Sequence, residues 1–81
     1  MGKYDPLHDH LAGQRGQQIR LSFQEIEQII GEPLPQSAYQ HAWWWANEDP
    51  RTTAHVQCRA WREAGYDAEL QLTRRAVTLT R

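Results

Sequence analysis

HAWWWANEDPRTTAHVQCRAWREAG, residues 41–65, contains all four tryptophans and the only cysteine of this 81-residue chain. A buried indole removes roughly 150–250 Å² of surface from water, so two buried rings would dominate the core of so short a chain. Three consecutive tryptophans, Trp43 to Trp45, cannot all point inward from one regular element. We therefore expect a wedge of buried indoles under the core, with at least one ring half exposed. That ring either shows only its edge or is free to stack on a base or contact a partner.

The second half of this stretch predicts an amphipathic helix over residues 51–65. At about 100° per residue, the side that carries Trp61 is apolar and is expected to pack on the core. The opposite side carries Arg51, His55, Arg59 and Arg62. Thr52 or Thr53 would cap the helix, and Gly65 would end it. The basic side is either a solvated face or a face that contacts phosphates or acids.

The remaining elements follow from local signals along the chain. A helix is expected from Asp5, a short strand around residues 19–21, and a second helix from Ser22, where S-x-x-E forms a capping box. A short helix over 36–41 and a hairpin over 66–81 complete the pattern. The order α-β-α-(short α)-α-β-β predicts a single α+β domain over residues 1–81, a small winged-helix-like domain. In that architecture helix 51–65 would be the reading helix and the hairpin the wing, although the insertion 33–47 lengthens the link before the helix.

Charge is distributed unevenly along the chain. Residues 1–50 carry a net charge of −4 and residues 51–81 carry +3, within an overall charge of −1. This asymmetry is compatible with docking on nucleic acid and equally with contact between proteins. No apolar run approaches the roughly 20 residues of a membrane span, and the polar N-terminus predicts no signal peptide. A single cysteine excludes an internal disulfide and is compatible with a reducing cytoplasm.

The residue patterns that carry enzyme or metal chemistry are missing from the sequence. His55 and Cys58 are one helical turn apart, but no CxxC or HExxH spacing accompanies them. The segment Gly13 to Gly16 lacks the frame of a phosphate-binding loop. We therefore expect no catalytic residues, no metal site, no cofactor, and no enzymatic activity.

Several short motifs together resemble those of a family of small bacterial and phage domains of unassigned function. They are K-Y-D-P-L at 3–7, L-S-F-Q-E-I-E at 21–27, L-P-Q-S-A at 34–38, W-W-x-N at 44–47 and R-A-W-R-E-A-G at 59–65. The resemblance spans nearly the whole chain. It implies a stand-alone domain that is sometimes attached to larger proteins, and it assigns no catalytic residues. Trp43, which makes the run triple, departs from the family pattern.

The first functional hypothesis is a nucleic-acid-binding module that uses helix 51–65 and the hairpin tip at 73–75, with DNA preferred to RNA. The expected contact residues are Arg51, His55, Gln57, Arg59, Arg62, Arg74 and Arg75. The arginines would hold phosphates, and Gln57 or His55 would contact a base edge.

The alternative is a protein-binding adaptor or inhibitor, encoded by a phage or another mobile element, that acts through an exposed tryptophan and an acidic face. Its expected contact residues are Trp44, Tyr4, Tyr39 and Asn47. No membrane partner is expected. A homodimer is also compatible with the sequence, because an exposed indole or the open edge of the last strand could pair with a second copy.

Overall fold

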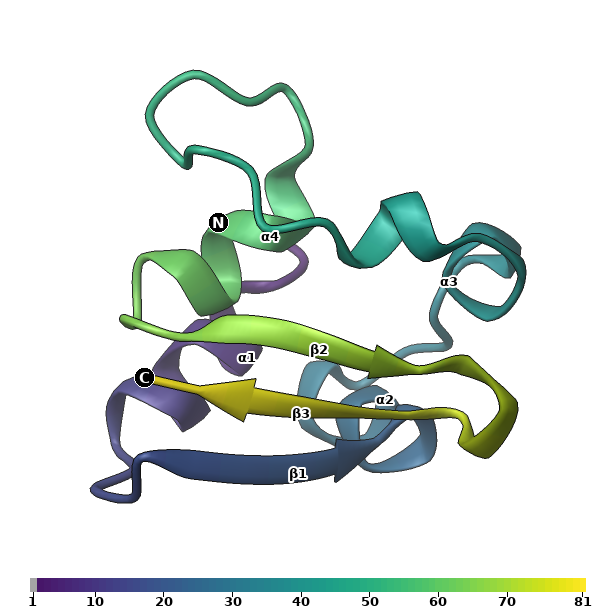
Figure 1. Cartoon of the computed structure of the whole chain (residues 1–81), viewed down its shortest axis with the longest axis horizontal. Helices are drawn as coiled ribbons and strands as arrows, with labels where there is room; N and C mark the ends of the chain where they lie inside the picture. The colour runs from purple at the N-terminus through teal and green to yellow at the C-terminus, as the bar shows by residue number, and fades with distance from the viewer. Residues whose placement is uncertain (1) are drawn as a thin grey trace.

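Four α-helices and a three-stranded sheet form the domain in the computed structural model, which describes residues 2–81 (Figure 1). In chain order the elements are α1 (Asp5–Ala12), β1 (Gln18–Ser22), α2 (Phe23–Ile30), α3 (Gln36–Gln40), the 3-10 helix η1 (Ala42–Trp45), α4 (Val56–Arg62), β2 (Asp67–Gln71), the 3-10 turn η2 (Leu72–Arg74) and β3 (Ala76–Thr80). The α+β class predicted from the sequence is confirmed.

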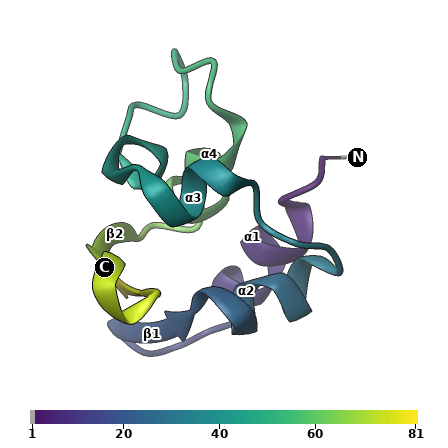
Figure 2. The ribbon, with the colours of Figure 1, turned by 90° about the vertical axis from the view of Figure 1, so that its right-hand side faces the viewer.

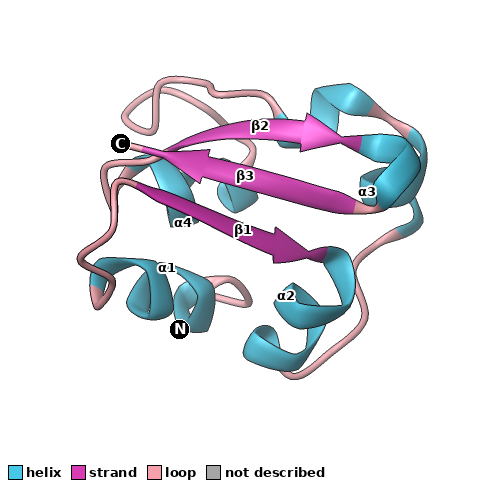
Figure 3. Cartoon of the chain, turned by 60° about the horizontal axis from the view of Figure 1, so that its bottom comes forward, coloured by secondary structure: helices cyan, strands magenta, loops and turns pink. Residues whose placement is uncertain are grey.

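The sheet has the strand order β1-β3-β2, and both strand pairs are antiparallel. β3, the last strand, therefore lies in the middle of the sheet. The expectation that its open edge could pair with a second copy is wrong, because both of its edges are already bonded. The helices pack behind one face of the sheet and leave the other face uncovered (Figure 3).

Apolar side chains lie on the covered face, as the alternation within each strand predicts. Leu21 of β1 and both Val77 and Leu79 of β3 are buried there. Arg20 and Glu69, at alternate positions, belong to the uncovered face and are exposed. Figure 2 shows α1, α2 and α4 gathered on one side of the strands, where they close the core.

α2 begins and ends where the sequence predicts. The Ser22 hydroxyl accepts a hydrogen bond from the Glu25 amide at 3.0 Å, and the Glu25 carboxylate accepts one from the Ser22 amide at 2.9 Å, so the capping box is confirmed. Gly31 ends the helix with φ 79°, a conformation that favours glycine. Phe23 and Ile26 turn toward the core and are buried.

The three consecutive tryptophans form the 3-10 helix η1. With about three residues per turn, neighbouring side chains point about 120° apart, so three successive rings must face three directions. Trp44 and Trp45 turn into the core, and Trp43 turns away from it. The Trp45 ring stacks on Phe23 and on Trp61, with centroid separations of 4.9 and 5.7 Å. The predicted aromatic wedge is therefore present beneath α4.

α4 begins at Val56, so the prediction of a helix from Arg51 is wrong for its first part. Residues 46–55 instead form a loop that projects from the domain (Figure 1). The Thr53 amide bonds to the Asp49 carbonyl at 3.0 Å, and the Thr53 hydroxyl accepts a bond from the His55 amide at 3.0 Å. Such local bonds from short polar side chains compete with helix formation, so the helix begins later in the chain, at Val56.

Candidate functional site

Trp43 and Val56 are the most exposed large apolar side chains in the described part of the chain, at 51% and 57%. Trp44, predicted as the exposed anchor, is only 5% exposed and packs edge-on against Tyr4. That prediction is wrong because the 3-10 geometry of η1 directs Trp44 inward. Trp43 is therefore the indole that a partner can reach.

Two imidazole rings lie against Trp43. The His41 ring is nearly parallel to the indole, with centroids 6.0 Å apart, and the His55 ring is tilted, with centroids 5.7 Å apart. His41 directly precedes η1 and His55 directly precedes α4, so side chains from both ends of this segment hold Trp43. We call His41, Trp43 and His55 the Trp43 surface. His41 was not among the predicted contact residues. The sequence signal that pointed to this surface was Trp43 itself, which departs from the family pattern.

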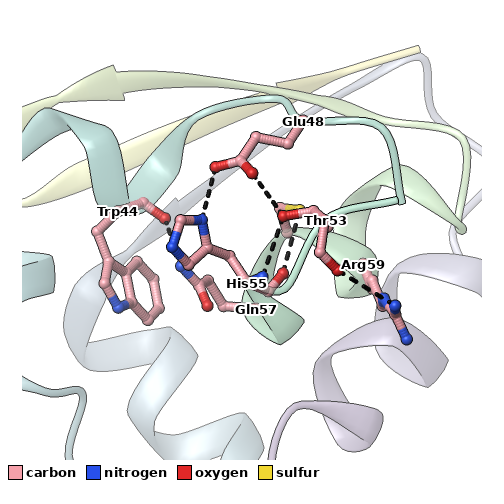
Figure 4. A network of polar contacts seen from close by, with 7 residues as sticks. Trp44, Glu48, Thr53, His55, Gln57 and Arg59 are labelled. Atoms are coloured by element: carbon pink, nitrogen blue, oxygen red, sulfur yellow. Dashed lines mark hydrogen bonds and ion pairs between the residues drawn. The ribbon is translucent and has the colours of Figure 1, made fainter. Parts of the chain in front are cut away.

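Glu48 connects His55 to Thr53 at the base of the projecting loop (Figure 4). One carboxylate oxygen lies 2.8 Å from His55 Nδ1, and the other accepts a hydrogen bond from the Thr53 hydroxyl. The bond from Thr53, and then the bond from His55, hold the pKa of Glu48 below its usual value. His55, predicted to contact nucleic acid, is instead bonded to Glu48, and its tilted ring lies against Trp43.

Gln57 and Cys58, in the first turn of α4, are buried below this network. Gln57 is 7% exposed and donates a hydrogen bond to the Trp44 carbonyl at 3.2 Å, so the prediction that it reads a base edge is wrong (Figure 4). The Cys58 thiol lies 3.3 Å from the His55 carbonyl, and burial raises its pKa. A raised pKa favours the neutral thiol, whereas nucleophilic chemistry requires the thiolate.

Asn47, predicted as a partner contact, forms its hydrogen bonds within the domain. Its Oδ1 accepts from the Trp61 indole N–H at 2.9 Å and from the Ala68 amide at 2.7 Å. Its Nδ2 donates to the Ala68 carbonyl at 2.9 Å. The side chain thus forms with Ala68 the pair of hydrogen bonds that a neighbouring strand would form at the outer edge of β2. Its bonds connect the residues after η1 to α4 and to the sheet.

Tyr4 forms part of the wall of a cleft between the N-terminal segment and α4. The cleft has a volume of about 280 Å³, and its lining includes Lys3, Val56 and Arg59. Burial raises the pKa of the Tyr4 hydroxyl, and its ring packs edge-on to Trp44. Tyr4 is therefore a half-buried wall of the cleft and does not project as an anchor.

Tyr39, the fourth predicted partner contact, packs against the hairpin tip. Its hydroxyl donates a hydrogen bond to Glu27 at 2.9 Å, and the Arg75 guanidinium lies 5.4 Å from the centre of its ring. Burial, and then the bond to Glu27, raise the pKa of Tyr39. This residue therefore links α3 to α2 and to the hairpin tip.

The arginines of the predicted nucleic-acid face have different surroundings. Arg51 is paired with Asp49 at 3.1 Å, and Arg62 is paired with Asp67. The Arg51 guanidinium holds the pKa of Asp49 below its usual value. Arg59 is exposed and bonds to the Thr53 carbonyl at 3.3 Å, so it is the one arginine of this helix face whose guanidinium has no carboxylate partner within residues 2–81.

Arg74 and Arg75 lie at the hairpin tip, at the opposite end of β2 from α4 (Figure 1). The segment 36–47 runs between the two groups, since Tyr39 contacts the tip and Asn47 is bonded to the start of β2. The structure therefore does not gather the predicted arginines on a common surface.

Between Gly2 and Arg81, no group of three or more His, Cys, Asp and Glu side chains is placed to hold a metal ion. None of the helices in this part of the chain is long and apolar enough to cross a membrane.

Asn47→Ala should lower the free energy of unfolding by about 2 kcal/mol, because the Trp61 indole and the Ala68 backbone lose their partners together. Urea unfolding of the purified domain measures this loss. Gln36→Ala is the control, since Gln36 is exposed on α3 and its side chain forms no hydrogen bond in the described structure; it should change stability by less than about 0.5 kcal/mol. Equal effects of the two substitutions would contradict the role of Asn47.

Glu48→Gln should destabilise the domain near neutral pH and much less in acid. The folded-state pKa of Glu48 lies below the usual 4.5, so its stabilisation is present above that value and is lost as the pH falls through the lowered pKa. The difference in unfolding free energy between wild type and variant, measured from about pH 7 to about pH 3, should therefore shrink. Glu63→Gln, whose carboxylate has no hydrogen bond or ion pair within residues 2–81, should show no such convergence. A gap that stays constant with pH would show that the Glu48 charge does not matter.

Comparison with known proteins identifies a family. A search of curated proteins found no match, and a search of solved structures found none either. A family model described as a domain of unknown function (DUF7662) matches residues 4–81, which include every helix and strand of the structure. The chain therefore belongs to this family of domains of unknown function.

Proposed function

We propose that this domain binds a partner protein and that the Trp43 surface is the contact site. The observation that carries the proposal is the exposure of Trp43, whereas the three other indoles of the chain are buried. An exposed indole contributes much apolar area when a partner covers it, and tryptophan is enriched among the residues that dominate interface energies.

The surface is also held in position before any partner arrives. His41 and His55 lie against the indole, and Glu48 fixes His55 through a 2.8 Å bond. A side chain that is already ordered loses less conformational entropy on binding, which favours affinity. Binding of this kind is the activity of an adaptor or of an inhibitor, and the proposal includes both.

Trp43→Ala should remove partner binding and leave the domain folded. Loss of a central aromatic anchor costs about 2 kcal/mol or more, so the affinity for the partner should fall by about 30-fold. The measurement is quantitative mass spectrometry of proteins captured from a lysate of the source organism by the wild type and the variant. Calorimetric titration of the purified partner then gives both affinities.

Trp44→Ala is the matched control, because it removes the neighbouring indole from the core. It should lower the free energy of unfolding by about 3–5 kcal/mol, whereas Trp43→Ala should change it by less than about 1 kcal/mol. Capture of the same proteins with unchanged affinity by Trp43→Ala would refute the Trp43 surface as the contact site.

We propose nucleic-acid binding through the hairpin tip as a second candidate. The supporting observation is that Arg74 and Arg75 are exposed and have no carboxylate partner among the described residues. The order of the elements and the strand order β1-β3-β2 agree with a winged helix-turn-helix architecture, in which α4 would be the reading helix and residues 72–75 the wing. Because a fold does not establish a function, the unpaired arginines carry this candidate.

Binding of mixed-sequence duplex DNA should depend on salt through these two arginines. Each phosphate contact contributes about 0.9 to the slope of log K against log salt, so Arg74→Ala combined with Arg75→Ala should reduce the slope by about 1.8. Fluorescence anisotropy at several salt concentrations measures it. Arg51→Ala with Arg62→Ala is the control, since both guanidinium groups are already paired with carboxylates. An unchanged slope in the tip variant, or no DNA binding at low salt, would exclude this candidate and leave the Trp43 proposal intact.

A further inference from the structure

The backbone of β1 turns polar groups outward along its free edge. Two hydrogen bonds that flank the strand set its pairing with β3: the Arg81 amide donates to the Gln17 carbonyl, and the Phe23 amide donates to the Arg75 carbonyl, both at 2.8 Å. In an antiparallel ladder, alternate residues bond to the neighbouring strand, and the residues between them turn away from it. The backbone N–H and C=O groups of odd-numbered residues of β1 therefore bond to β3. Those of even-numbered residues point away from β3, toward the free edge of the sheet.

The outward residues are Gln18, Arg20 and Ser22. The Ser22 amide is already bonded to Glu25 in the capping box of α2. For Gln18 and Arg20, no hydrogen bond outside the sheet involves the backbone N–H or C=O within the described residues. Two donors and two acceptors are thus left in a row, with the spacing that an additional antiparallel strand requires.

The other edge of the sheet is less open. By the same alternation, the backbone N–H and C=O groups of Ala68 and Leu70 in β2 point away from β3. Asn47 already bonds both the amide and the carbonyl of Ala68. Leu70 is then the one residue of this edge with free backbone groups, and a single residue does not form a row to which another strand could bond. A strand that extends this sheet would therefore pair with β1.

A groove of about 300 Å³ lies beside this edge, on the side of the sheet that carries the helices. Its lining comes from three elements: His10 of α1, Leu21 of β1, and Glu25, Gln28 and Ile29 of α2. Side chains of an added strand alternate between the two faces of the sheet. Those on the helical side would enter this groove and pack against Leu21 and Ile29, which form its apolar part.

On the uncovered face the same strand would meet Arg20. This side chain is exposed, and no salt bridge within residues 2–81 includes it. Side chains directly opposite each other on paired strands have Cβ atoms about 4.5–5.5 Å apart, so opposite charges at such positions attract. An acidic residue opposite Arg20 would therefore be favoured.

We propose that the edge of β1 binds an extended, antiparallel peptide segment of a partner protein, in which an acidic residue lies between two apolar residues. The acidic residue exchanges both backbone hydrogen bonds with Arg20 and pairs with its guanidinium. The apolar residues on either side turn into the groove beside Leu21 and Ile29. Backbone bonds of this kind supply affinity, and the alternating side chains supply specificity. The site is separate from the Trp43 surface and does not depend on it.

The probe is a heptapeptide of sequence STVEVTS, acetylated and amidated at its ends and titrated into the nitrogen-15-labelled domain. The amide resonances of Gln18 and Arg20 should shift most. N-methylation of the glutamate amide removes the donor to the Arg20 carbonyl and should abolish these shifts. N-methylation of the preceding valine should preserve them, because that amide points away from β1.

Charge reversal supplies the second test. Arg20→Glu should weaken binding of STVEVTS by about fivefold or more and favour the lysine peptide STVKVTS. Arg59→Glu, the same change on α4, and Trp43→Ala, in the other site, should both leave the affinity for STVEVTS within about twofold of wild type.

Three results would overturn this proposal. The first is an absence of shifts at Gln18 and Arg20 at millimolar peptide, and the second is equal binding by the two N-methylated peptides. The third is a shift of the same amides with protein concentration alone, which would assign the edge to a second copy of the chain. Each leaves the Trp43 proposal intact, because Trp43→Ala tests that site separately.

Discussion

The packing of Trp45 on Trp61 is the contact on which the rest of this domain depends. It places η1 beneath α4, with the two rings 5.7 Å apart, and Asn47 then bonds both the Trp61 indole and the edge of β2. One short segment thereby connects the core, the helix and the sheet. The 3-10 geometry that turns Trp44 and Trp45 inward also forces Trp43 outward. The exposed indole is therefore a direct consequence of how the core is built.

Elements whose limits are set by neighbouring residues could be predicted from the sequence. An element whose start depends on competition between helix formation and the hydrogen bonds of a loop could not. The limits of α2 follow from Ser22, Glu25 and Gly31, whose effects act within one turn of the helix. The hairpin follows from alternation in the same way. The start of α4 was predicted too early because propensity says nothing about the bonds of Thr53, whose hydroxyl joins Glu48 to the His55 amide. Those bonds exist only once the loop has closed.

The candidate site shows the same division. Helical spacing correctly separated an apolar side from a basic side within α4. It could not show that Arg62 forms an ion pair with Asp67, beyond the turn that follows the helix, or that Gln57 bonds to the Trp44 carbonyl. The run of three indoles correctly implied one exposed ring. Identifying that ring required the 3-10 conformation of η1, because a strand or an α-helix would have distributed the rings differently. Asn47 was predicted only as a partner contact, because its bonds to Ala68 depend on long-range packing.

The two proposed sites also bear on whether the domain acts as an adaptor or as an inhibitor. Trp43 lies in η1, the 3-10 helix that contacts β2, whereas the other site is the free edge of β1. β3 lies between these two strands, so the two sites lie beyond opposite edges of the sheet. Ligands that occupy them approach from different sides and need not compete. An inhibitor needs only one surface to block its target, whereas two independent surfaces allow one small domain to hold two partners together. Two sites of the kind we propose would therefore suit an adaptor better than an inhibitor.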